Sequence, residues 1–334
     1  MLRAPVISHA AILAAVILAA VFATHEFAQA PTVSASRPSP SSATTFDRAV
    51  RPNTLLQVQV RYQRDQARSF DALRRGLLPI IDDHNGEVAV AVADLQTGER
   101  FHINGQALHV AGSVIKVYTG LSAWRSVQDG VLPLDRVDDL LFETFIVQSN
   151  DAAAILGQMV GFEAINEEMR RFGAHHSVLT HHPGYVAQQA QGYVANSNLT
   201  TALDSIDALA TLWHGDALGL EASRAFLERM DSRHTVFGLP GGLPPQARII
   251  RKDGIVSPSD PDSHWLDADA VNDIAIVEFD RDGTTYAYAI GVFMQHNRSQ
   301  VAAWQLTRAI STMVWDFFVE ERYPLDATPS PGAG

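Results

Sequence analysis

The 334-residue sequence contains no cysteine and only two lysines, Lys116 and Lys252. The lack of cysteine excludes disulfides and thiolate chemistry, and it leaves the redox compartment open. All of the other residues among the 25 Lys and Arg residues are arginine. Surface charge therefore does not require lysine in this protein. Lys116 and Lys252 therefore stand out as positions that need a property of lysine that arginine lacks.

Positive charge is also scarce overall, because the formal net charge is -12. This balance disfavours sequence-independent nucleic-acid binding, which depends on cations that neutralise phosphates. We therefore expect no nucleic-acid partner. With 46% hydrophobic residues, the chain is long enough to bury a full core, in one large or two small domains.

The first 30 residues have the composition of an export segment. Arg3 precedes an apolar run over residues 6–23, and Ala28-Gln29-Ala30 has the A-x-A form of a cleavage site. Pro31 follows at once and is unfavourable for cleavage, so a cleaved signal peptide and an uncleaved membrane anchor both stay open. Either one predicts a periplasmic or other extracytoplasmic location.

The rest of the chain is organised as a linker, one folded domain and a tail. Residues 31–53 form a linker rich in Pro and Ser, residues 54–325 form the domain, and residues 326–334 are expected to be disordered. Hydrophobic periodicity predicts helices over 55–82, within 113–235 and over 299–322, and strands over 86–95, 98–104, 247–254, 271–280 and 284–294. The last two strands are joined by the hairpin turn Arg281-Asp282-Gly283. This order predicts an α/β protein: a mixed, mainly antiparallel sheet flanked by helices, with a helical subdomain inserted.

Lys116 lies in an S-x-x-K sequence that begins at Ser113. If a helix begins at the serine, the two side chains lie on one face, one turn apart. Lysine can take the proton of a serine hydroxyl when burial or a neighbouring cation keeps the amine neutral, whereas arginine stays charged in proteins. The helix N-terminus also offers N–H groups to an oxyanion.

Lys252 lies in RIIRKDGIV, at the end of a predicted strand. Gly254 lets a second backbone or a substrate approach this strand closely. A compact ammonium here can bind a substrate carboxylate and lower the pKa of Lys116. S-x-x-K alone is a weak signal, and the alternative for both lysines is a solvated surface role.

Between the two lysines lies IVQSNDAAAIL, residues 146–156. With this segment the chain resembles the penicillin-recognising serine hydrolases, especially class A β-lactamases, whose three motifs in order are S-x-x-K, S-x-N and K-[TS]-G. INEEMRRFGAHHSVL, NLTTALD and VNDIAIVEF extend the resemblance, which covers residues 60–322. It implies the β-lactamase/penicillin-binding fold and an acyl-enzyme on Ser113 with Lys116 as the base. Lys252 would anchor the substrate, and the N–H groups of Ser113 and Ile255 would bind the oxyanion.

The middle motif can be aligned with this family in two ways. Ser149-Asn150-Asp151 keeps the serine but places Asp where the family has Asn. Alternatively, Asn150 is the family's Asn, and Gln148 then replaces the serine. We favour the second alignment, in which Asn150 orients Lys116 and the substrate amide. It removes the hydroxyl that passes a proton to the leaving group, a role that the adjacent Ser149 is placed to take.

Two further departures concern turnover and substrate. From Met169 to Leu203 the chain has no Asp or Glu, although the resemblance places the deacylating glutamate of class A enzymes in this stretch. Asp253 replaces the Thr or Ser of the third motif, and its charge weakens the attraction of Lys252 for a carboxylate. We therefore expect slow or altered deacylation of β-lactams, D-alanyl cell-wall peptides or small esters. The alternative is a catalytically impaired binding or sensing module at the cell wall.

Four histidines, His175, His176, His181 and His182, lie within the loop that lacks acids. They raise the options of a metal site or of a histidine that activates the deacylating water. No carboxylate or cysteine accompanies them, so we favour loop and packing roles. We expect neither a metal nor a cofactor.

Overall fold

The computed structural model describes residues 69–181, 198–230, 237–256, 270–297 and 299–325. The predicted export segment 1–30, the linker 31–53 and the tail 326–334 lie outside these ranges. All described residues belong to one unit of the chain, Asn53–Gly334. Within the described ranges, no helix has the length and hydropathy needed to cross a membrane.

In the described part of the chain, five strands form one antiparallel sheet in the order β2-β1-β7-β6-β5. They are β1 (Glu87–Asp94), β2 (Arg100–Ile103), β5 (Arg248–Val256), β6 (Ala270–Arg281) and β7 (Thr284–Gln295). All five lie where the sequence predicts strands. Asp282 and Gly283 have φ angles of 49° and 77°, as expected of the tight turn that joins a two-residue hairpin.

The sequence of β1, EVAVAVAD, places different side chains on the two faces of the sheet. Successive side chains of a strand point to opposite faces. Val88, Val90 and Val92 therefore pack in one core cluster, and the alanines between them pack in the other. Small alanines let helices on the second face come close to the sheet.

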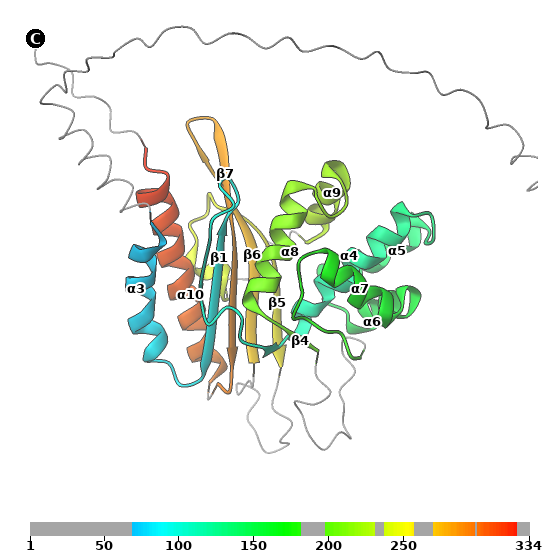
Figure 1. Ribbon diagram of the computed structural model, residues 1–334, viewed down its shortest axis with the longest axis horizontal. Helices are drawn as coiled ribbons and strands as arrows, with labels where there is room; N and C mark the ends of the chain where they lie inside the picture. Colours follow the sequence, from blue (N-terminus) through cyan, green and yellow to red (C-terminus); the bar gives the residue numbers. More distant parts are fainter. Residues whose placement is uncertain (1–68, 182–197, 231–236, 257–269, 298, 326–334) are drawn as a thin grey trace, which may run out of the picture. The chain divides into compact units, whose positions relative to one another are not determined.

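The first face is covered by α3 (Phe70–Asp82) and α10 (Gln300–Asp316), which flank the sheet together in Figure 1. Ser69 is extended and caps α3 by accepting a hydrogen bond from Asp71 N at 3.2 Å. Of the helix predicted over 55–82, the structure describes Phe70–Asp82 as helical, and residues 55–68 lie outside the described ranges. The predicted final helix divides into α10 and a π-helical turn, Phe317–Arg322.

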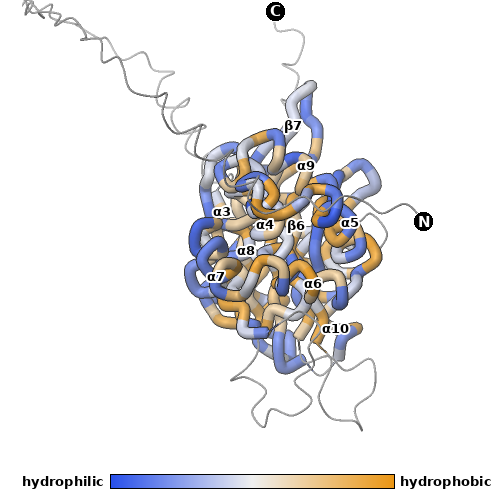
Figure 2. The backbone as a smooth tube through the Cα atoms, turned by 90° about the vertical axis from the view of Figure 1, so that its right-hand side faces the viewer, coloured by the Kyte–Doolittle hydropathy of each residue, from blue (hydrophilic) through white to orange (hydrophobic). Residues whose placement is uncertain are grey.

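The second face is covered by the helices that lie between β2 and β5 in the sequence (Figure 1). They are α4 (Ile115–Gln128), α5 (Leu134–Phe145), α6 (Asn150–Val160), α7 (Phe162–Arg171), α8 (Ala202–His214) and α9 (Leu220–Met230). Figure 2 looks onto this layer and shows hydrophobic stretches on α4 and α6 and a largely hydrophilic α7. The predicted helical insertion is confirmed. A short ladder of β3 (His109–Val110) with β4 (Leu199–Thr200) was not predicted.

Candidate active site

Ser113 lies in a 3-10 turn, Gly112–Val114, that leads directly into α4. The structure thus places Ser113 and Lys116 in one continuous helical start, three residues and about one turn apart. Asn272 of β6 fixes this turn, since its Nδ2 donates to Val110 O at 2.7 Å and to Ala111 O at 3.1 Å. The serine is half-buried, and its backbone N–H is at the positive end of the helix.

Gly254 brings the edge strand β5 against the turn that carries Ser113. A Cβ atom at Gly254 would lie 2.7 Å from Ala111 O and 2.8 Å from Ser113 N. Only glycine allows this approach, as the sequence predicted. The neighbouring residue, Ile255, therefore has its backbone beside the nucleophile turn, where the resemblance places the second oxyanion donor.

Lys116 is buried within α4, with 1% of its surface exposed. Its Nζ donates to the backbone oxygens of Gln148 at 3.1 Å and of Ser149 at 3.3 Å. Burial first, and then the charge of Lys252, lower the pKa of Lys116 to about 8, although Asp253 opposes this shift. A neutral lysine amine has two N–H donors and one lone pair. The two carbonyls match these donors and leave the lone pair for a proton.

Lys252 is buried to the same degree, with 1% exposed, and it contacts the middle motif directly. Its Nζ donates to Gln148 Oε1 at 2.7 Å, to Asp253 O at 2.7 Å and to Asp253 Oδ1 at 3.3 Å. Burial chiefly lowers the pKa of Lys252, and Asp253 opposes the shift. Gln148 therefore links both lysines, through its backbone oxygen to Lys116 and through its side chain to Lys252.

The contacts of the middle motif place Gln148, rather than Ser149, beside the lysine of the third motif. Gln148 has φ 66°, an uncommon conformation for this residue type, and its Nε2 donates to Phe145 O at 2.8 Å. Ser149 caps α6, and its hydroxyl accepts from Ala152 N at 3.1 Å. Asn150 is the first residue of α6 and is exposed. In the described part of the chain, Lys116 is held by carbonyls and not by the Asn150 side chain.

Asp253 stands at the open side of this network, with 35% of its side chain exposed. Burial would raise the pKa of Asp253, but the charges of Lys252 and Arg251 lower it below its usual value. Arg251 points to the opposite face of β5, where it forms a bidentate pair with Asp273 at 3.0 and 2.9 Å. Its guanidinium also lies 3.6 Å from Asp253 Oδ2.

The sequence model of the Beta-lactamase enzyme family matches residues 72–139 and 136–318. The chain belongs to this family. No curated protein matches the chain by sequence. Among solved structures, a β-lactamase from Chitinophaga pinensis has a TM-score of 0.65 at 22% identity, covering 74% of this chain and 99% of that one. A β-lactamase from Xanthomonas campestris has a TM-score of 0.63 at 20% identity, covering 75% and 98%.

A third similar structure is the TLA-3 extended-spectrum β-lactamase, with a TM-score of 0.64 at 18% identity. It covers 75% of this chain and 100% of that chain. At these identities the structural likeness establishes the fold, and the family match establishes a β-lactamase-like serine hydrolase. Both confirm the resemblance on which Ser113, Lys116 and Lys252 were assigned.

Hydrogen bonds join Asn198 to Thr180 and His181, across the segment 182–197 that lies outside the described residues. Asn198 Oδ1 accepts from Thr180 N at 2.8 Å and from His181 N at 3.2 Å, and its Nδ2 donates to His181 O at 3.1 Å. His176 pairs with Asp204 through Nδ1 at 3.2 Å, while His182 lies outside the described residues. Among the residues described, no cluster of His, Asp or Glu is arranged to hold a metal ion.

Sequence reasoning missed Asn272, Arg251 and Asp273, which position the site from the sheet. The signal was present in VNDIAIVEF, where Asn272 and Asp273 interrupt an apolar strand. Both residues are buried, at 1% and 2% exposure. Buried polar side chains on opposite faces of one strand require partners on both sides of the sheet.

Proposed function

We propose that this β-lactamase-like protein is an exported serine hydrolase that forms an acyl-enzyme on Ser113 and releases the acyl group slowly. The observation that carries the proposal is the position of Gln148, which joins the two lysines of the chain beside the turn that holds Ser113. The substrate classes are β-lactams, D-alanyl peptides and small esters.

In the acylation step, Ser113 Oγ attacks the substrate carbonyl while neutral Lys116 accepts the hydroxyl proton. The N–H groups of Ser113 and Ile255 stabilise the oxyanion. Collapse of the tetrahedral intermediate breaks the bond to the leaving group, which receives the proton held by Lys116. The Gln148 amide does not relay protons, so transfer is direct or through the Ser149 hydroxyl, which keeps its own proton to donate while it caps α6.

Slow deacylation is supported by the lack of acidic residues from Met169 to Leu203. Hydrolysis of an acyl-enzyme requires a base that removes a proton from the attacking water. His176 is committed to Asp204. Without a carboxylate in this stretch, the acylated serine is expected to persist.

Export is supported by the N-terminal sequence alone. Cell fractionation of the full chain, with N-terminal sequencing of the recovered protein, tests it. Extracytoplasmic protein that begins at Pro31 indicates a cleaved signal, and membrane-bound protein that keeps residues 1–30 indicates an anchor. Recovery in the cytoplasm contradicts export.

The acyl-enzyme is tested with a fluorophosphonate serine probe and with a fluorescent penicillin, followed by peptide mass mapping. We expect an adduct on Ser113 in the wild type and none in Ser113→Ala. Equal labelling of both proteins, or no adduct with either reagent, contradicts the proposal and favours a binding module.

A further inference from the structure

We propose that Asp253 is a specificity-determining residue that excludes substrates with a carboxylate beside the scissile bond, so that the site selects neutral or cationic esters and amides. This inference rests on the proposed function and narrows its substrate class. A Thr or Ser hydroxyl at this position could donate a hydrogen bond to a substrate carboxylate, whereas the carboxylate of Asp253 would repel it.

The ammonium of Lys252 is already saturated by the protein. An ammonium has three N–H donors. Within the described residues, Gln148 Oε1 at 2.7 Å, Asp253 O at 2.7 Å and Asp253 Oδ1 at 3.3 Å accept from it. A substrate carboxylate can bind Lys252 only by displacing one of these oxygens.

Asp253 is anionic, and in the chain it stands between Lys252 and Gly254. Its side chain is 35% exposed, while Lys252 beside it is 1% exposed, so a substrate reaches the carboxylate before it reaches the ammonium. Gly254, the next residue, contacts the Ser113 turn. A carboxylate on a bound substrate would therefore lie near a fixed negative charge, and like charges repel strongly in a partly desolvated site.

The remaining charges near the site leave no net positive charge for an anion, although the Arg251 guanidinium also lies 3.6 Å from Asp253 Oδ2. Arg251 is paired with Asp273 through two hydrogen bonds at 3.0 and 2.9 Å, and this pair is neutral as a unit. In the reactive form Lys116 is neutral, so Lys252 and Asp253 also sum to zero. Across these five described residues, the reactive site offers no net positive charge to an anionic substrate.

The chain next to the site residues is apolar and exposed. Val147, which precedes Gln148, is 61% exposed, and Ile255, which follows Gly254, is 38% exposed. Such side chains favour contact with uncharged substrate groups. Charge and apolar exposure thus point to the same class of carboxylate-free acyl substrates.

The test compares benzylpenicillin with its methyl ester, which differ by one charge beside the leaving nitrogen. The rate constant for acylation of Ser113 is measured by intact mass and divided by each compound's rate of alkaline hydrolysis. In the wild type we expect the ester to react at least about tenfold faster than the acid. Asp253→Thr should reduce this ester-to-acid ratio at least about tenfold.

Asp280→Asn is the matched control, because Asp280 is exposed on β6 near the hairpin and carries the same charge. An equal effect of Asp280→Asn, a wild type that reacts equally with acid and ester, or an unchanged ratio in Asp253→Thr contradicts the inference. Failure of both penicillins while a neutral fluorophosphonate still labels Ser113 contradicts it too. If no reagent labels Ser113, the proposed function fails instead.

Discussion

At the residue scale, the proposed mechanism makes the reactivity of Ser113 depend on the protonation of one buried amine, that of Lys116. Burial and Lys252 lower the pKa of Lys116 to about 8, and only the neutral form accepts a proton. Below this pKa the neutral fraction falls tenfold for each pH unit. Acylation by a neutral ester should therefore rise with pH, with a midpoint of about 8, and then level off. A pH–rate profile measured by adduct mass checks this.

The charge of Asp253 sets the direction in which the midpoint of this pH–rate profile moves when Asp253 is replaced. Asp253 raises the pKa of Lys116 by its charge, so Asp253→Asn should move the midpoint to lower pH. Asp280→Asn serves as the control and should leave the midpoint in place. A midpoint that moves to higher pH in Asp253→Asn contradicts the assignment of Lys116 as the base.

The variant Gly254→Ala gives a further prediction at this scale. A methyl group at this position would lie 2.7 Å from Ala111 O and 2.8 Å from Ser113 N, so β5 or the nucleophile turn must move. A displacement of this size is expected to reduce acylation about 100-fold. Gly98→Ala adds the same group where nothing lies within 4 Å, at a φ of 74° that strains alanine, so it controls for the effect of backbone strain without a clash at the Ser113 turn. An equal loss in both variants would show a general effect of the methyl group.

The sequence predicted the residues whose types are rare or chemically distinctive, namely Ser113, the two lysines and Gly254. It did not predict that Gln148 joins both lysines. That contact depends on the backbone of Gln148, whose φ of 66° turns the side chain toward β5. Glutamine is uncommon in this conformation, and the sequence around Gln148 has no turn signal such as the Asp282-Gly283 pair that would predict it.

At the scale of elements, strand alternation in β5 directs Arg251 and Lys252 to opposite faces of the sheet, and Asp253 at the strand's end contacts both of them. Lys252 faces the helical layer, and Arg251 faces η2 (Leu239–Gly242) and α10. Asp273 Oδ2 also accepts from Leu239 N at 2.9 Å, so the ion pair holds η2 to the sheet. The strands were predictable from their β-branched residues. The pairing of Arg251 with Asp273 was not, because it depends on the alignment of β5 with β6.

Breaking the Arg251–Asp273 ion pair should lower the free energy of unfolding. Arg251→Leu leaves the Asp273 carboxylate buried without its main partner, which is expected to cost about 3 to 5 kcal/mol. Chemical denaturation measures this free energy of unfolding. The double variant Arg251→Leu/Asp273→Leu should lose less than the single variant, because it removes the uncompensated charge. A larger loss in the double variant contradicts this account.

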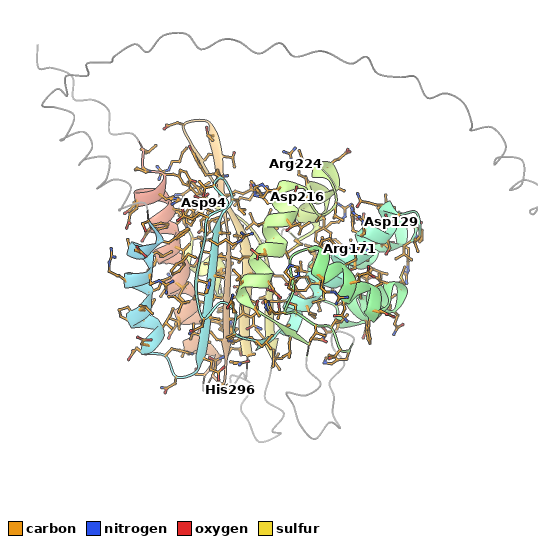
Figure 3. The ribbon with its side chains drawn as sticks, viewed as in Figure 1. Asp94, Asp129, Arg171, Asp216, Arg224 and His296 are labelled. Carbon is orange, nitrogen blue, oxygen red and sulfur yellow. The ribbon has the colours of Figure 1, made fainter. Side chains whose placement is uncertain are left out.

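At the scale of the whole described unit, the C-terminal segment is joined to the sheet at the end opposite His296 (Figure 3). Asp94 is fully buried, and its Oδ2 accepts from Arg322 Nε at 2.8 Å and from Tyr323 OH at 2.7 Å. These hydrogen bonds join the end of β1 to the residues that follow α10. The order of helices and strands predicted this architecture, but not the residues that close it.

Asp94→Ala should lower the free energy of unfolding by about 3 kcal/mol, because it leaves buried donors without their acceptor. Acylation of Ser113 measured well below the melting temperature should change little, because Asp94 pairs with Tyr288 of β7, whereas Asn272, which holds the Ser113 turn, pairs with Phe293 toward the other end of β7. Thermal melting and adduct formation are measured on the same sample. Loss of acylation in a folded Asp94→Ala protein would contradict this separation of stability from chemistry.

The central claim is that Lys116 activates Ser113 to form an acyl-enzyme that persists. The most direct measurement follows the mass of the Ser113 peptide over time in the wild type and in Lys116→Arg, after reaction with a neutral activated ester. We predict one acyl group on the wild type that remains for minutes after dilution, and no adduct on Lys116→Arg. Equal labelling of the two proteins, or loss of the wild-type adduct within seconds, would contradict the account.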